Sequence, residues 1–419
     1  MSAAGLIVIV LALMLLRQNL FVILGCVTGY AYFVFAGEPL DGIILDAWSA
    51  LNKDILLSIP LYILAGNIMA RGGIAGRLIR FMRAMTAPVP GGLAIAAVLS
   101  CAVFAAVTGS GTVTLVAVGA VMYPALIEAG YNKSFALGAL CAAGTLGVII
   151  PPSIPLILYG VMTRTNIAEL FIAGIGPGLL LTFLMIGYAL WCNRRGDREA
   201  WSVRELFDSL RDGIWALFMP VLILGGIYSG IFTPTESAAV AVVYAILTEA
   251  LIYREMHVRD LGAVMLQTGR LLGALFPVLM LAFSLNMFLT YQQVPEAMVG
   301  WLSERISEPT LLLIGTNVFL IMIGCLMDIG SAILVLAPML APLMTDNGMN
   351  PIHFGIVMVV NLEIGYLTPP LGLNLIVAMG VFREEFWTIC RAVLPFVLLM
   401  LTGLLLIAFY PSLSTILLD

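Results

Sequence analysis

Small hydroxyl and glycine residues interrupt two long apolar segments of this 419-residue sequence, and these interruptions carry groups that can bind an ion. The first is TGSGT, residues 108–112, at the centre of the apolar run 91–127. The second is MDIGS, residues 327–331, in the middle of the run 311–345. A polar, glycine-rich tip within such a run is typical of a re-entrant hairpin. A membrane tolerates such a hairpin only where protein or water surrounds the tip.

Two further apolar runs contain paired prolines, at which a membrane helix must break. Pro151-Pro152 interrupts the run 134–163, and Pro369-Pro370 interrupts the run 352–381. A broken helix leaves carbonyl groups unpaired at the end of its first half and N–H groups unpaired at the start of its second half. Carbonyl oxygens suit a bare cation, whereas N–H groups suit a carboxylate. We therefore predict two cation sites and one anionic-substrate site between the tips.

The polar residues beside the four interruptions are the candidate substrate ligands, because their hydroxyl and backbone groups lie next to helix ends. Thr368 also matches a helix cap followed by proline at the first helical position. The predicted substrate-binding residues are Ser110, Gly111, Thr112, Ser153, Asp328, Ser331 and Thr368. Each motif alone is also explained by helix-packing notches of small residues. Four motifs in symmetric register favour the functional interpretation.

Three acidic residues lie within or beside apolar runs, where the cost of charge in a bilayer indicates function by default. Asp328 is predicted to hold a cation or a substrate hydroxyl, with a purely structural cap of the tip as the alternative. Glu363 precedes Thr368 and either orients that break or belongs to a buried network. Glu236 starts a helix after Pro234 and is interpreted as structural.

The two interrupted regions form an internal repeat. A shift of 218 residues superposes Pro124, Gly130, Asn132, Gly147 and Pro151-Pro152 on Pro342, Gly348, Asn350, Gly365 and Pro369-Pro370. These coincidences exceed what composition bias produces.

Composition identifies an all-α polytopic membrane protein. AVILMFWYC residues make up 62% of the chain and DEKR residues only 10%, with a mean hydropathy of +1.09. A net charge of -5 with two lysines excludes a basic face for nucleic acid. The two histidines are about a hundred residues apart, and GYNKS, residues 130–134, lacks the glycines of a phosphate-binding loop. We therefore predict that the chain is not an enzyme, with a channel or an intramembrane enzyme as the alternative.

The basic residues predict the orientation. Five arginines lie in the loop 193–212, which the positive-inside rule places in the cytoplasm. Counting crossings from that loop puts 16 basic residues inside and leaves Lys53, Arg164 and Arg305 outside. The apolar run 2–16 is interpreted as a retained membrane span and not as a signal peptide. The same count places both termini outside, and it inverts the two repeats. Inverted repeats with broken helices are typical of secondary transporters.

Several stretches of the chain resemble one known family, the large membrane permease subunit of tripartite ATP-independent periplasmic (TRAP) transporters. The resemblance lies in AVTGSGTVTLVAVGAVMYPAL from Ala106, GTLGVIIPPSIPLILYG from Gly144, GIYSGIFTPTESAAVAVVYA from Gly226, MDIGSAILVLAPML from Met327 and GYLTPPLGLNLIVAMG from Gly365. Together these stretches span most of the chain. The resemblance implies an elevator transporter, driven by a sodium gradient, that imports small organic acids such as four-carbon dicarboxylates or sialic acid.

The resemblance also implies ligands and partners. Two sodium (Na+) sites are expected on Gly109, Ser110, Gly147, Ile150 and Ser153 in one repeat and on Asp328, Gly330, Gly365 and Thr368 in the other. A soluble periplasmic substrate-binding protein is expected to deliver the substrate. A small four-helix membrane subunit is expected as a separate polypeptide. The complex is expected in the bacterial inner membrane, with both termini of this chain in the periplasm.

These expectations divide the chain into a moving transport domain and a scaffold. Residues 86–165 form the first transport repeat, with hairpin 91–127 and broken helix 134–163. Residues 309–382 form the second, with hairpin 311–345 and broken helix 352–381. The remaining segments, 1–85 and 166–308, are predicted to be scaffold helices and arms, and 383–419 a C-terminal helix.

Overall fold

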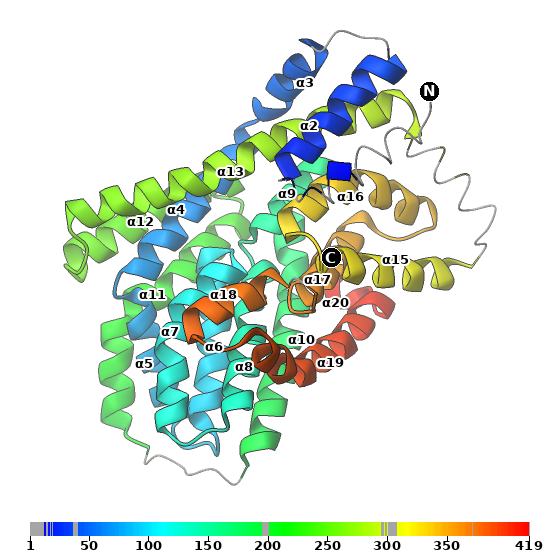
Figure 1. Ribbon diagram of the computed structural model, residues 1–419. Coiled ribbons are helices and arrows are strands. Elements are labelled where there is room, and N and C mark those ends of the chain that lie inside the picture. The colour runs from blue at the N-terminus through cyan, green and yellow to red at the C-terminus, as the bar shows by residue number, and fades with distance from the viewer. Residues whose placement is uncertain are drawn as a thin grey trace.

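The computed structural model describes residues 12–13, 16, 18, 20–36, 41–194, 201–294, 297, 300, 308–370 and 372–418 (Figure 1). Its described residues form helices and no strand, and eight helices are long and apolar enough to cross a membrane. This confirms the predicted all-α polytopic membrane class. The predicted first span, 2–16, lies almost entirely outside the described residues.

The first scaffold segment leads into an amphipathic arm helix. Its elements are α2 (Leu20–Tyr30), η1 (Ala31–Ala36), α3 (Asp41–Leu51), η2 (Asp54–Leu57), α4 (Ser58–Arg71) and α5 (Ile74–Thr86). Helix α5 has no acidic residue in its first turn, and the buried Glu249 carboxylate accepts hydrogen bonds from the backbone N–H groups of Gly73 and Ile74 instead, both at 3.0 Å. The carboxylate of a residue from a distant segment therefore pairs with the N–H groups at the start of this helix.

Arg77 ties the same arm helix to two other segments. Its guanidinium contacts Asp212 at 3.3 Å and Glu255 at 2.6 Å, and it lies 3.8 Å from the centroid of the Tyr253 ring. The hydrogen bond to Glu255 raises the pKa of Arg77 above its ordinary value. The arm is thereby fixed to the helices that surround it.

The first predicted hairpin is present as two helices joined at the polar tip. Helix α6 (Gly92–Thr108) ends where Gly109 adopts a left-handed conformation with φ of +60°, and α7 (Gly111–Glu128) begins two residues later. The predicted broken helix follows as α8 (Lys133–Thr145), η3 (Leu146–Val148) and α9 (Ile154–Thr163). Asn132 caps α8 through its side chain, and Ser153 caps α9.

Long helices connect the two repeats. They are α10 (Ile167–Asn193), α11 (Val203–Tyr228), α12 (Pro234–Leu247), η4 (Thr248–Ile252) and α13 (Val258–Tyr291). Helix α10 packs along α6, α17 and α19, and α13 packs along α3, α2 and α4. The predicted boundary at residue 165 therefore separates α10 from helices that it contacts extensively, and the domain division stays a prediction.

The second repeat has the same plan as the first (Figure 1). Helices α15 (Pro309–Gly324) and α16 (Ile329–Asp346) form the hairpin, and α17 (Pro351–Gly365) and α18 (Leu373–Phe382) form the broken helix. The sequence predicted that Thr368 caps the second half of the broken helix, and this prediction was wrong. Its hydroxyl donates to the carbonyl of Ile364 at 2.8 Å, so it closes the end of α17, and Gly372 takes the cap position of α18.

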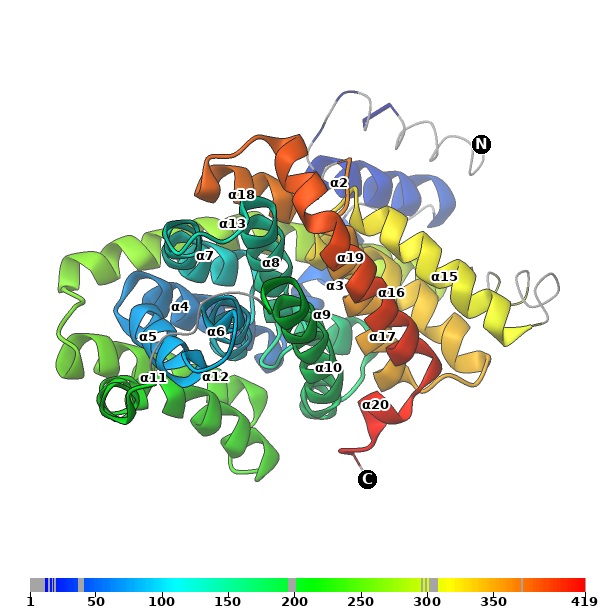
Figure 2. The ribbon, with the colours of Figure 1, turned by 90° about the horizontal axis from the view of Figure 1, so that it is seen from below.

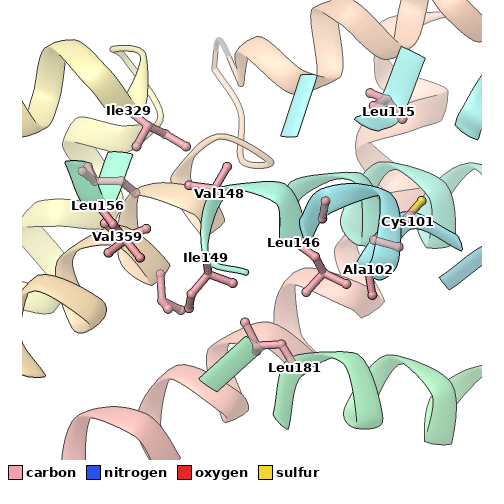
Figure 3. Close-up of a cluster of buried hydrophobic side chains, with 14 of the residues drawn as sticks. Cys101, Ala102, Leu115, Leu146, Val148, Ile149, Leu156, Leu181, Ile329 and Val359 are labelled. Carbon is pink, nitrogen blue, oxygen red and sulfur yellow. The ribbon is translucent and has the colours of Figure 1, made fainter. Parts of the chain in front are cut away.

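The C-terminal part consists of α19 (Phe386–Phe409) and α20 (Ser412–Thr415). Seen from below, α19 lies against α8 and α10 (Figure 2). Side chains from both repeats and from α10 fill the interior between them, including Leu146, Ile149, Leu181, Ile329 and Val359 (Figure 3). The first break is thus enclosed by protein, as a membrane-embedded break requires, whereas Pro370 at the second break and Leu373 and Ile376 on α18 are exposed in this chain.

Two glycines at equivalent positions of the repeat allow each broken helix to approach its own hairpin. A Cβ on Gly147 would lie 2.8 Å from the backbone of Ser110 in the first tip. A Cβ on Gly365 would lie 2.6 Å from the backbone of Gly324 beside the second tip. Both positions therefore exclude a side chain.

This close approach predicts that Gly365→Ala destabilises the protein. We expect a loss of about 1 to 3 kcal/mol in the free energy of unfolding, because the backbone contact must open. The matched control is Gly380→Ala, on a helix where a Cβ meets nothing within 4 Å. Apparent unfolding temperatures in detergent test this expectation. Equal temperatures for the two variants would contradict it.

Candidate functional site

A cavity of about 450 Å³ lies between the two hairpin tips and two helices outside the repeats. Residues 108–113 of the first tip and 328–330 of the second line it, together with the start of α9 and Tyr366. Helices α4 and α13 form the opposite wall. The structure therefore brings together six of the residues predicted from the sequence, namely Gly109, Ser110, Gly111, Thr112, Asp328 and Gly330.

Backbone contacts fix the first tip against the proline break. The N–H of Ile154 donates to the carbonyl of Gly109 at 3.3 Å, and a Cβ on Gly109 would lie 2.5 Å from the carbonyl oxygen of Pro152. Thr108 and Thr114 share a hydrogen bond of 2.9 Å behind the tip. The second repeat has a similar contact, because the N–H of Gly372, the counterpart of Ile154, donates to the carbonyl of Cys325 at 3.4 Å, two residues before the counterpart of Gly109.

The two tips differ in how their second helix begins. Ser110 precedes α7 but makes no side-chain cap, so the first N–H groups of α7 have no capping side chain within the described part of the chain. Asp328 caps α16 by accepting from the N–H of Ser331 at 2.9 Å and from its hydroxyl. The cavity is therefore bordered by an uncapped helix start on one side and a carboxylate on the other. These are the chemical partners of an anion and of a cation, respectively.

Asp328 caps the second tip, which is the structural role considered as the alternative from the sequence. It also lines the cavity, as a residue that holds a cation or a substrate hydroxyl would. Ser331 is buried and bonded to Asp328, so it supports the carboxylate without lining the cavity. Asp328 therefore caps α16 and also lines the cavity from a half-buried position.

The other predicted ligands lie behind the cavity wall. Ser153 is fully buried and bridges the break, accepting from the N–H of Leu156 at 3.3 Å and donating to the carbonyl of Val148. Ile150 directs its side chain toward Gly178 of α10, where a Cβ would lie 2.7 Å from it. These two residues, like Gly147, Gly365 and Thr368, do not line the cavity.

Three lining residues carry polar side chains that the sequence analysis did not select, namely Asn67, Gln267 and Tyr366, whereas Thr108 belongs to the polar motif 108–112. Asn67 on α4 donates to the hydroxyl of Thr268 on α13 at 3.0 Å. Asn67 and Gln267 each stand inside an apolar run, and an isolated amide at membrane depth was the available signal. A Cβ on Gly66 would lie 3.2 Å from Thr108, so α4 touches the first tip closely.

The two remaining acids have defined partners. The side chain of Glu363 is buried and accepts from the hydroxyl of Thr145 at 2.7 Å, which favours the buried-network alternative of the two considered from the sequence. Thr145 and Glu363 are equivalent positions of the internal repeat, so this bond joins the two broken helices. Glu236 forms a reciprocal capping box with Thr233, in agreement with its structural interpretation.

Known proteins match this architecture. The family model of the tripartite ATP-independent periplasmic transporter, DctM component, matches residues 7–413. The chain is 38% identical to the C4-dicarboxylate TRAP transporter large permease protein DctM of Pseudomonas aeruginosa, covering 93% of this chain and 92% of that protein. It is 36% identical to the isethionate TRAP transporter permease protein DctMQ of Oleidesulfovibrio alaskensis, covering 91% of this chain and 61% of that protein.

A solved structure shares the fold. The Alcanivorax borkumensis YdaH transporter matches with a TM-score of 0.66 at 14% identity, over 90% of this chain and 88% of that one. Two interrupted repeats packed around a cavity among membrane-crossing helices thus define a multi-pass membrane transport protein. The chain belongs to the DctM component family of TRAP transporters, the large permease subunits. Its relatives are named as permeases, in agreement with the prediction that it is not an enzyme.

The two contacts of Asp328 predict different outcomes for two substitutions. Asp328→Ala removes the cap of α16 and should lower the free energy of unfolding by about 1 kcal/mol. Asp328→Asn retains an oxygen that can accept from the N–H of Ser331, so it should change stability by only a few tenths of a kcal/mol. Thermal unfolding of both variants in detergent tests this. Equal destabilisation would show that the charge, and not the cap, stabilises the tip.

Proposed function

We propose that this chain is the large permease of a sodium-gradient-driven importer of a small organic acid. The observation that supports this most is the meeting of both hairpin tips in one cavity, with an uncapped helix start and a carboxylate at its border. The name of the Pseudomonas relative suggests a C4-dicarboxylate as the first substrate to test. The isethionate relative suggests a small sulfonate as the second, and sialic acid remains a candidate from the resemblance.

The substrate anion would bind at the start of α7. Among the described residues no lysine or arginine lines the cavity, so the N–H groups at Gly111 and Thr112 are the donors best placed for a carboxylate. The hydroxyls of Ser110 and Thr112 and the amide of Gln267 add polar contacts at the same wall. A dicarboxylate carries two negative charges, and the start of one helix would balance only part of them. Bound cations would supply the remaining positive charge.

Sodium fits the oxygen groups of the two tips. Within the described residues no group of three His, Cys, Asp or Glu side chains could hold a metal ion, so the donors here are mainly carbonyl and hydroxyl oxygens. The first repeat offers the backbone around Gly109 and Ser110 beside the Pro151-Pro152 break. The second offers Asp328 and the turn after Gly365. Hard oxygen donors without sulfur or imidazole suit an alkali cation.

An elevator mechanism would follow from how the cavity is enclosed. The hairpins and broken helices make one wall of the cavity, and α4 and α13 make the other. Sliding the first wall along the second would expose the cavity to either side of the membrane in turn. The arm helix α5 connects the two parts, since it packs on α6 as well as on α11.

We further propose two protein partners. The family is described as a tripartite periplasmic transporter, and this description accords with a soluble binding protein and a second membrane subunit as partners. The relative named DctMQ is longer than this chain, which covers 61% of it, so the remainder is a candidate for the small subunit. The inner membrane is the proposed location, with both termini in the periplasm.

We predict sodium-dependent uptake by the reconstituted complex without ATP. Liposomes carrying this chain, its small subunit and its binding protein should accumulate a C4-dicarboxylate when sodium is higher outside, and omission of the small subunit should abolish uptake. Asp328→Asn should lower apparent sodium affinity on the order of 100-fold, because a buried charged ligand is lost. Asp346→Asn, at the exposed far end of the same helix, is the matched control.

Two further variants test the first repeat. Ser110→Leu should abolish uptake with the complex still assembled, because Ser110 lines the cavity. Ser153→Leu should also abolish uptake, because it removes the hydroxyl that bridges the proline break. Glu236→Gln should reduce assembly before it alters sodium dependence, because it weakens the capping box. Uptake that persists without the gradient, or only with internal ATP, would contradict the proposal. A single-channel current in planar bilayers would favour the channel instead.

A further inference from the structure

A second cavity lies at one end of α8, α10 and α19, away from the hairpin tips. Its volume is about 590 Å³. Arg194 at the end of α10 and Arg391 on α19 line it, together with Asn132 and Ser134 at the start of α8. No carboxylate is among the lining residues in the part of the chain that the structure describes. Two guanidinium groups from separate helices therefore border one hollow whose described wall carries no negative charge.

Both arginines are available to a ligand. Within the described residues neither Arg194 nor Arg391 forms an ion pair. Lys133 and Glu384 lie nearby but are paired at 2.8 Å, and Glu384 also accepts from the hydroxyl of Tyr123 at 2.9 Å. The bond to Lys133 holds the pKa of Glu384 below its usual range, so this carboxylate stays charged and committed to Lys133.

The remaining wall of the cavity is aromatic. Phe135, Tyr188, Trp191 and Phe396 line it and contact one another, with ring centroids 5.0 to 6.4 Å apart. Trp191 is 65% exposed. Exposed tryptophan beside tyrosine is typical of the level where lipid headgroups meet the hydrocarbon of a membrane. The cavity thus combines positive charge with an apolar surface at that level.

Each arginine also stands at the end of an exposed apolar stripe. On α19 the outward face carries Arg391, Leu394, Leu398 and Leu405, spaced as one side of a helix. On α10 the outward face carries Leu179, Phe183, Trp191 and Arg194. The stripe on α19 extends about 21 Å from its arginine at 1.5 Å per residue. This length exceeds one leaflet of hydrocarbon, which is about 15 Å thick.

We propose that this cavity binds the headgroup of an anionic phospholipid from the surrounding bilayer. The phosphate lies between Arg194 and Arg391, and the hydroxyl of Ser134 donates to it. The glycerol region lies against Tyr188 and Trp191, and the acyl chains follow the apolar stripes of α10 and α19. A free phosphate ion would use the arginines but not the stripes. The adjoining apolar surface therefore favours the lipid as the occupant.

The location gives this lipid a defined contact with the transport machinery. Helix α8 is the first half of a broken helix, and α19 packs along it and along α10 (Figure 2). A headgroup held by Arg194 and Arg391 bridges α10 and α19 where both meet the start of α8. The inference is independent of the proposed substrate and of sodium coupling, because it uses residues outside the first cavity.

Native mass spectrometry of the full-length chain in detergent, titrated with phosphatidylglycerol or phosphatidylcholine, tests the proposal. We expect the wild type to retain phosphatidylglycerol more strongly than the zwitterionic lipid. The double variant R194Q/R391Q should bind phosphatidylglycerol on the order of ten- to thirty-fold more weakly, because two arginines near a lipid phosphate are lost. The matched control is R204Q/R259Q, which removes the same charge from two exposed positions outside the cavity.

Three results would overturn the proposal. The first is equal retention of the two lipids by the wild type, a comparison that does not depend on any variant folding. The second is an equal loss of affinity in both double variants, which would reflect net charge alone. The third is displacement of phosphatidylglycerol by millimolar inorganic phosphate or glycerol phosphate, which would assign the cavity to a soluble phosphate compound.

Discussion

Backbone hydrogen bonding without water is the constraint on which this fold depends. Four interruptions at membrane depth leave N–H and carbonyl groups that hydrocarbon cannot satisfy. The protein satisfies part of them internally, through Ser153 across the first break and Thr368 at the end of α17. Backbone bonds from Ile154 to Gly109 and from Gly372 to Cys325 join each break to its own hairpin. Of the remaining groups, those of Gly111 and Thr112 at the start of α7 line the cavity, where a ligand can complete them.

The two repeats hold their breaks in similar ways, but their tips differ. Gly147 and Gly365 both lack room for a side chain, so at these two positions each broken helix approaches its hairpin backbone to backbone. The tips then diverge, because Asp328 caps α16 whereas the start of α7 has no side-chain cap. This asymmetry places a carboxylate on one side of the cavity and open N–H groups on the other. A symmetric scaffold thereby presents two different chemical surfaces to one hollow.

Much of this arrangement could be predicted from the sequence, because glycine, proline and hydroxyl residues within apolar runs have strong local consequences. Both hairpins and both broken helices lie where the motifs indicated, as do six residues of the cavity wall. Thr368 was assigned to the wrong helix end, since local pattern could not show that α17 continues its turn to that residue. Asn67 and Gln267 were missed because their role depends on which scaffold helices face the tips. That pairing is set by tertiary packing.

Equilibrium binding of radioactive sodium to the purified complex tests the central claim most directly, since it requires neither uptake nor a known substrate. The account predicts saturable binding that excess potassium does not displace and that Ser110→Leu removes, because the first tip supplies oxygen ligands directly. Binding should survive Asp346→Asn, which lies at the far end of α16 from the cavity. Absence of saturable sodium binding in the wild type, or unchanged binding in Ser110→Leu, would contradict the assignment of the hairpin tips as the cation site.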